Sequence, residues 1–318
     1  MTIVDSGALT ADGEDRAARP LKPGEPAWKR LTHHRLAVVG ATVLLVLALG
    51  ALLAPVLAPY PVDPLLDRAQ LAQRFQPPSS QHWFGTDDLG RDVFTRILWG
   101  GRVSLLIGIS VAAAATAIGT AVGTTAGWFG GWVDEALMRC TDLLLVIPGL
   151  AVLMIAQHGL GESTGVIVVV LSLSSWPTIA RVVRAEILSL RQREFVEAAR
   201  ATGASAWRVV TRHLLPNVVG TITVYATLVV GGAILAESAL AFLDFGLPAP
   251  TPSWGKMLAG FKGSSGTSTA YLIYFPGLAI LLTVLAVNLV GNGLRDIADP
   301  RHPGSVRRGD GASSRPRR

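Results

Sequence analysis

Long apolar segments without a charged residue alternate with polar ones along most of the chain. Three of them contain 23 to 25 residues: Leu36–Ala58, Val103–Gly127 and Tyr271–Leu294. Two shorter ones, Ser163–Ala180 and Val218–Ala236, contain 18 and 19 residues. A helix needs about 20 apolar residues to cross the hydrocarbon core of a bilayer. These five segments are therefore predicted to be membrane-spanning helices.

A sixth apolar segment, Val133–Gln157, is less regular than the others. Four charged residues interrupt its first half: Asp134, Glu135, Arg139 and Asp142. Pro148 lies near its middle and predicts a kink, because proline lacks a backbone N–H and its ring clashes with the preceding turn. With this segment as the third span, the predicted fold class is an all-α integral membrane protein with six transmembrane helices.

Basic residues are distributed unevenly between the two sides that six spans define. The side that carries both termini holds residues 1–35, 181–212 and 292–318, with 20 of the 28 Lys and Arg residues. The opposite side holds 59–102 and 242–270, with seven. Because short cytoplasmic loops carry the excess of Lys and Arg, both termini are predicted to be cytoplasmic.

The predicted organisation follows from these spans. The predicted parts are a cytoplasmic N-terminal tail (1–35), a first transmembrane helix (36–58), an extracytoplasmic segment (59–101), a transmembrane core (102–291) that includes the loop 194–217, and a cytoplasmic C-terminal tail (292–318).

Composition agrees with a membrane protein and excludes several other classes. Half of the 318 residues are hydrophobic and 16% are charged, whereas soluble domains carry about 25% charged residues. The net charge of +6 is explained by topology, so no nucleic-acid partner is predicted. The single cysteine, Cys140, forms no internal disulfide and no cysteine-rich metal site.

Sequence patterns of catalytic sites are missing. The chain contains no GxxxxGK[ST] phosphate loop, no HExxH metal motif and no GxSxG nucleophile motif. We therefore expect no enzymatic activity and no cofactor or metal in this chain. Energy for active transport has to come from a partner or from an ion gradient.

The predicted cytoplasmic loop between spans 4 and 5, Glu194–Asn217, is polar but has apolar residues at helical spacing. Gly203 divides it into two short helices, and Pro216 is expected to end the second helix and direct the chain back to the bilayer. A rigid helix pair of this kind suits docking into a groove of a cytoplasmic protein. An amphipathic helix on the membrane surface explains the pattern equally well.

The spacing within this loop resembles the EAA loop of the permeases of binding-protein-dependent ABC importers. Glu197-Ala198-Ala199 is followed after three intervening residues by Gly203 and, after nine further intervening residues, by His213-Leu-Leu-Pro216. His followed by Leu-Leu-Pro-Asn is similar to the peptide/nickel (DppC/OppC-type) subgroup. The resemblance implies that the loop couples to an ATPase subunit. The residues implied are Glu197, Ala198, Ala199, Gly203, Leu215 and Pro216.

Other segments resemble the same subgroup, from about Lys29 to Arg301. They include Phe84–Arg96 before span 2, Arg139–Asp142 with Ile147-Pro148, Ala236–Leu243, Pro250–Gly255 and Gly291–Arg301.

The resemblance implies a fold, a function and a set of partners. The fold is that of a type I ABC importer permease, and the function is ATP-driven import of di- or oligopeptides across the cytoplasmic (inner) membrane by alternating access. The implied partners are a second, related permease, two ABC ATPases that bind ATP and Mg, and an extracytoplasmic substrate-binding protein. Alternatives are an importer of nickel chelates or glutathione, an ion-coupled secondary transporter acting alone, and a membrane scaffold without transport activity.

Three charged residues within or beside the spans are candidates for the pathway or its gate. Arg139 and Asp142 share a helix face and either line the pathway or form an internal salt bridge, which is the favoured interpretation. Glu237, in the outer part of span 5, either lines the pathway or bonds to loop backbone at the outer rim.

Two further groups have competing interpretations. Gly119, Gly123 and Gly127, four residues apart, are predicted to let a neighbouring helix approach closely. On the outer side, three aspartates either contact a docked binding protein or solvate the loop: Asp87, Asp88 and Asp92.

Overall fold

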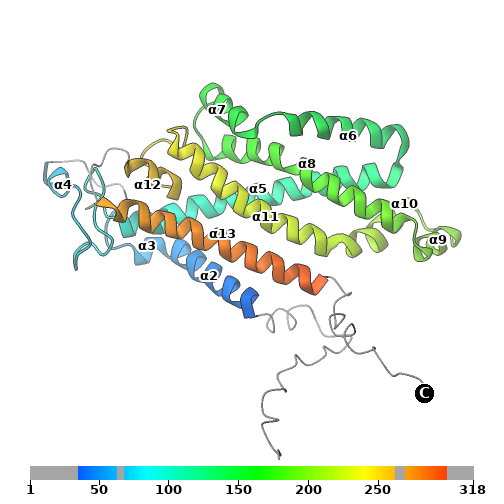
Figure 1. Ribbon diagram of the computed structural model, residues 1–318, viewed down its shortest axis with the longest axis horizontal. Helices are drawn as coiled ribbons and strands as arrows, with labels where there is room; N and C mark the ends of the chain where they lie inside the picture. The colour runs from blue at the N-terminus through cyan, green and yellow to red at the C-terminus, as the bar shows by residue number, and fades with distance from the viewer. Residues whose placement is uncertain (1–34, 63–67, 262–268, 299–318) are drawn as a thin grey trace, which may run out of the picture.

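The computed structural model describes residues 35–62, 68–261 and 269–298. These residues form an elongated helical bundle (Figure 1). Of the predicted tails, only Arg35 and residues 292–298 are described, and both belong to helices, α2 and α13. The rest of each tail lies outside the described residues and stays a prediction.

Among the described residues, five helices are long and apolar enough to span a membrane. They are α2 (Arg35–Leu52), α5 (Val93–Phe129), α8 (Thr164–Arg191), the continuous helix Ala206–Phe242 that ends in α11 (Leu215–Phe242), and α13 (Tyr271–Ala298). Each contains most of one predicted span. The prediction of these five helices is confirmed.

The sixth span is broken into two helices. Helices α6 (Gly131–Val146) and α7 (Gly149–Leu160) meet at an angle of 79°. The break falls at Ile147 and Pro148, where the backbone is extended, because the residue before a proline is disfavoured in the helical region. The structure thus has up to six spans if this bent pair is counted as one.

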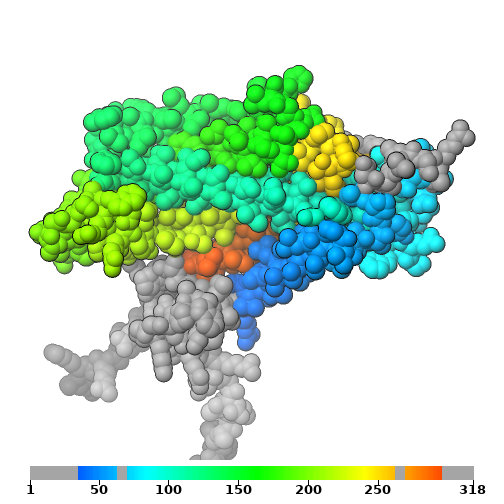
Figure 2. Space-filling view, turned by 180° about the vertical axis from the view of Figure 1, so that it is seen from behind, coloured from blue at the N-terminus to red at the C-terminus, as the bar shows by residue number. Residues whose placement is uncertain are grey.

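Short helices define the two ends of the bundle. One end, here called the α12 end, carries α3 (Ala54–Leu57), α4 (Arg68–Ala72) and α12 (Trp254–Gly260). The opposite end, here called the α9 end, carries α9 (Glu194–Ala201) and α10 (Ala206–Val209). Figures 1 and 2 both show these groups at opposite ends of the long axis.

Helix α5 is the central element of the bundle and begins ten residues before the predicted start of span 2. Asp92 caps it by accepting a hydrogen bond from the backbone N–H of Thr95 at 2.7 Å, which satisfies a donor that has no partner within the helix. The first residues of α5 therefore belong to the segment 59–101. The side of the membrane on which that segment lies stays a prediction.

The glycine repeat of α5 packs against α8. A Cβ atom at Gly119 would lie 2.7 Å from Cβ of Ile179, and one at Gly127 would lie 2.9 Å from Cβ of Ile187. At Gly123 the added atom would collide with the carbonyl oxygen of Ala180. The predicted close approach of two helices is confirmed.

The path of the chain after α10 corrects one expectation. Pro216 does not end the second short helix. Instead, α10 continues through the π-helical segment η1 (Val210–Leu214) into α11, with Pro216 in the first turn of α11. The wider π turn accommodates a residue that has no N–H to donate and whose ring would clash in a regular α-helix.

Candidate functional site

The segment Glu194–Asn217, called the α9–α10 element from here on, lies at the α9 end of the bundle (Figure 2). It folds as the short helix α9, a turn, and the first turns of the continuous helix Ala206–Phe242. Gly203, with φ of +81°, forms the turn between them, a backbone conformation that favours glycine. Val196, Val209 and Leu214 are fully buried in one cluster with residues of α8. The element is therefore fixed to the bundle on its inner side.

The structure divides the six predicted coupling residues into two groups. Glu197, Ala198, Gly203 and Pro216 are exposed. Ala199 and Leu215 are half-buried and pack against the cluster that fixes the element. The first four are thus available to a partner, and the other two hold the element in place.

Two large apolar side chains on this element were not singled out as site residues from the sequence. Trp207 is 78% exposed and Phe195 is 41% exposed. The guanidinium of Arg200 lies 4.4 Å from the ring centre of Trp128 and so joins α9 to the end of α5. Exposed aromatic residues of this size are typical of protein interfaces.

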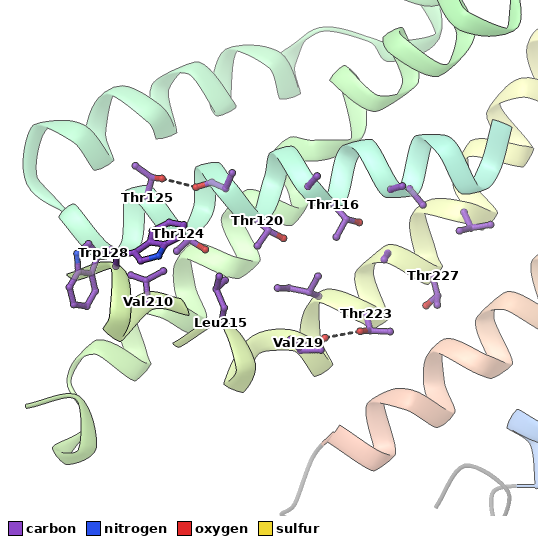
Figure 3. Close-up of a pocket in the computed structure, with 18 of the residues that line it drawn as sticks. Thr116, Thr120, Thr124, Thr125, Trp128, Val210, Leu215, Val219, Thr223 and Thr227 are labelled. Carbon is purple, nitrogen blue, oxygen red and sulfur yellow. Dashed lines mark hydrogen bonds between the residues drawn. The ribbon is translucent and has the colours of Figure 1, made fainter. Parts of the chain in front are cut away.

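A groove of about 1070 Å³ runs between α5 and the helix formed by α10, η1 and α11 (Figure 3). Its walls are alanine, valine, isoleucine, leucine and threonine side chains. Trp128, Phe129 and Trp207 lie among the lining residues nearest the α9 end. None of the described residues that line the groove carries a charge.

Three threonines of α5 lie four residues apart along the groove. Figure 3 shows Thr116, Thr120 and Thr124 projecting from α5 toward α11. Their hydroxyl oxygens are buried and have no hydrogen-bond partner among the described residues. Thr223 of α11, by contrast, donates to the carbonyl of Val219 in its own helix at 2.8 Å. The threonine repeat is visible in the sequence, but only the structure shows that it faces a groove.

Two aspartates of α6, Asp134 and Asp142, pair with arginines of α8 and not with charges of their own helix. Asp142 accepts from Nη2 of Arg181 at 2.5 Å, in a pair that is half-exposed. Asp134 accepts two bonds from Arg184, at 2.5 and 2.6 Å. The favoured interpretation, an Arg139–Asp142 salt bridge, is wrong, because α8 places a guanidinium closer to Asp142. Arg139 is exposed.

Glu237 is fully buried between α5, α11 and α12 and is not among the residues that line the groove. Hydroxyls of Ser104 and Ser238 each donate to its Oε2 atom at 3.5 Å. Bonding to loop backbone, which one interpretation expected, is replaced by bonding to serine side chains. A role in the pathway or its gate stays a prediction.

The three aspartates before α5 bond mainly to other groups of the protein. Asp87 accepts from the backbone of Leu89 and Arg91 and from Nε of Arg91, and Asp92 caps α5 and bonds His82 at 3.0 Å. Only Asp88 has a substantially exposed side chain. Partial burial, and then the neighbouring Asp87 carboxylate, raise the pKa of Asp88. The solvating interpretation is therefore wrong for Asp87 and Asp92.

The described residues define a multi-span helical membrane protein with an exposed helical element at one end and an uncharged groove beside it. Comparison with known proteins identifies the family within this class. The family described as "Binding-protein-dependent transport system inner membrane component" matches residues 119–302, and "N-terminal TM domain of oligopeptide transport permease C" matches residues 22–78. The chain belongs to the family of binding-protein-dependent transport permeases.

Two similar proteins align with this chain over most of their length. The dipeptide transport system permease protein DppC of Bacillus subtilis is 39% identical over 288 residues, which are 90% of this chain and 89% of that protein. A putative peptide transport system permease protein of Brucella abortus is 40% identical over 273 residues, 86% of this chain and 90% of that protein.

A solved structure of the MetNI methionine ABC transporter, in inward facing conformations, is more distant. It is 17% identical, with a TM-score of 0.46, and the match covers 61% of this chain and 94% of that chain. This likeness is too weak to support an argument.

Proposed function

We propose that this permease carries di- or oligopeptides through the groove between α5 and α11. The observation that carries the proposal is the absence of charge among the residues lining a groove of about 1070 Å³. A groove without charge suits cargo whose side chains vary, because no fixed charge selects one side chain over another. The names of its relatives, dipeptide and peptide permeases, favour peptides over nickel chelates or glutathione.

The α9–α10 element is the proposed contact with the motor. Four of its predicted coupling residues are exposed, and its buried face joins it to α8 and α11. A partner ATPase that grips it would move both helices. In this proposal ATP and Mg bind to two partner ATPases, and this chain hydrolyses nothing itself.

The remaining features of the assembly follow from the same proposal. The groove is open along one side, so one chain encloses only part of a pathway, and a second, related permease completes it in a heterodimer with the type I importer fold. An extracytoplasmic binding protein delivers the peptide at the α12 end. Both termini lie in the cytoplasm of a cell whose inner membrane holds the complex, in agreement with the distribution of basic residues.

Uptake by the complete complex in liposomes tests the function. Labelled dipeptide is expected to accumulate only with ATP inside the compartment that holds the ATPases, and an imposed ion gradient without ATP is expected to have no effect. Accumulation driven by the gradient alone would identify a secondary transporter instead. Transport of a nickel chelate but of no peptide would exclude the proposed cargo.

Gly203 tests the docking element. A Cβ atom there meets nothing within 4 Å, so an added side chain projects from the element without disturbing the bundle. We expect Gly203→Trp to abolish copurification of the ATPases while membrane insertion stays normal. Gly203→Ala carries most of the backbone strain of a positive φ, about 1 kcal/mol, but little bulk.

This pair of variants separates bulk from strain. If Gly203→Ala loses the ATPases as completely as Gly203→Trp, the loss comes from strain. If Gly203→Trp keeps them, the element does not dock there.

A further inference from the structure

Helix α12 is attached to the bundle through the backbone of its first turn. The N–H of Trp254 donates to the hydroxyl of Ser104 on α5 at 3.3 Å. The N–H of Lys256 donates to the hydroxyl of Ser253, which caps the helix, at 3.2 Å. These are N–H groups of the kind that a helix leaves without an internal partner.

Ser104 also bonds to Glu237 of α11, because its hydroxyl donates to Oε2 at 3.5 Å. Ser104, Ser253 and Glu237 are all fully buried. The hydroxyl of Ser104 therefore accepts from the backbone of α12 and donates to a carboxyl group of α11. The group formed by Glu237, Ser104 and the backbone N–H of Trp254 is called the clasp below.

Packing around the clasp leaves α12 little freedom. The indole Nε1 of Trp254 donates to the carbonyl of Ile97 on α5 at 3.0 Å. Gly255 lies so close to Ser238 of α11 that a Cβ atom would collide with its backbone. The clasp thus joins α12 to both α5 and α11.

Glu237 lies near one end of a long continuous helix. The helix Ala206–Phe242 has 37 residues, which corresponds to roughly 55 Å at 1.5 Å per residue. Its opposite end is the second half of the α9–α10 element. A rigid helix transmits a tilt applied at one end to the groups fixed at the other.

We propose that Glu237 is a positioning residue whose clasp makes α12 move as one body with α11, so that a movement of the α9–α10 element displaces α12. The inference rests on the proposed coupling role of that element. It assigns to the buried carboxyl group a task at the α12 end of the pathway, without contact with the peptide.

The distance between α12 and α11 tests the clasp directly. Spin labels are placed at Ala259 on α12 and at the exposed Val219 in the first half of α11, after Cys140→Ser removes the single cysteine. The complete importer is measured in lipid nanodiscs with and without trapped ATP. We expect one narrow distance distribution that ATP does not change.

Two variants open the clasp from different helices. Glu237→Ala removes its carboxyl group on α11, and Ser104→Ala removes the hydroxyl on α5 that bonds both Glu237 and the backbone of α12. Both are expected to broaden or shift the distribution when ATP is trapped. Peptide uptake is expected to fall about tenfold, with normal copurification of the partners and normal basal ATP hydrolysis. Ser104→Ala keeps the test valid if Glu237→Ala does not assemble.

Ser238→Ala is the matched control. Its hydroxyl also donates to Glu237, but Ser238 lies on the same helix and so cannot hold α12. Ser172→Ala removes a buried hydroxyl without a partner on α8. Both controls are expected to keep the distribution and the uptake of the unmodified complex.

Three results would overturn the proposal. The first is a wild-type distance that changes with ATP as much as in the variants, and the second is a distance that no variant alters. The third is a Glu237→Gln variant that changes the KM for different peptides while the distances stay fixed, because Glu237 would then touch the cargo. Failure of the coupling role itself is recognised separately, by ATPases that remain bound to Gly203→Trp.

Discussion

Helix α5 presents two neighbouring faces with the same spacing but opposite properties. One face carries Gly119, Gly123 and Gly127 and is closed against α8, with no room for a single added carbon atom. The other, about 100° around the helix, carries Thr116, Thr120 and Thr124 and opens onto the groove.

The comparison of the glycine face with the threonine face shows how the size of a repeated small residue sets the distance between membrane helices. Without a Cβ atom, the glycines let two backbones touch, and dispersion forces then hold α5 and α8 together. The threonines keep a methyl and a hydroxyl group that hold α11 away. Their hydroxyls have no partner among the described residues, a cost that a surface selected only for tight packing would avoid.

The largest effect is expected at the closed face. Gly123→Leu forces a side chain against the backbone of Ala180 and should destabilise the fold by about 3 kcal/mol. The amount of folded protein in membranes and its melting temperature in detergent measure this. Gly232→Leu on α11, where a Cβ atom meets nothing within 4 Å, is the control. Equal losses in both variants would mean that the closed face is no tighter than an open one.

A smaller effect, on transport alone, is expected at the open face. Thr120→Arg places a charge in a groove without one and should reduce peptide uptake about a hundredfold, since a charge in a membrane interior costs about 3 kcal/mol. Thr120→Val changes neither size nor charge and should keep the fold and most of the uptake. The contrast between the two faces is lost if Thr120→Arg unfolds the protein as Gly123→Leu does.

The smallest effect is expected where α6 meets α8. Asp134→Asn removes a two-bond pair with Arg184 that is mostly shielded from water, with an expected loss of about 1 kcal/mol. Asp142→Asn removes a pair in which both side chains are about half-exposed, 50% and 52%, and should change stability less. A larger loss for Asp142→Asn, measured by melting, would indicate that a partner or lipid covers that pair.

Sequence reasoning succeeded where one local property decides the outcome. The five spans follow from the length of the apolar segments. In lipid, a single helix forms all the hydrogen bonds that its backbone N–H and C=O groups need. The division of Glu194–Asn217 at Gly203 follows from the conformational freedom of one residue. The break at Pro148 was expected as a kink, but its angle of 79° depends on how α6 and α7 pack against α8.

Sequence reasoning failed where the partner of a group lies far along the chain. Asp142 shares a face with Arg139, yet it pairs with Arg181, 39 residues away. The sequence shows which residues share a face of one helix. It does not show which residues of a neighbouring helix lie opposite that face. Pro216 was expected to end a helix because proline interrupts helical hydrogen bonding, whereas the structure places it in the first turn of α11, directly after the π-helical segment.

The apolar segments of the sequence are sufficient to identify a helical membrane protein, and the motif in Glu194–Asn217 predicts a contact with an ATPase, since apolar length and motif spacing are both read along one dimension. Which threonines face the groove and which serines bond to Glu237 depends on how the helices pack in three dimensions. Ser104 and Glu237 are 133 residues apart, and a hydrogen bond depends on distance in space. Side chains on several helices meet only after the helices have packed, and packing is decided by the shapes of all of them together.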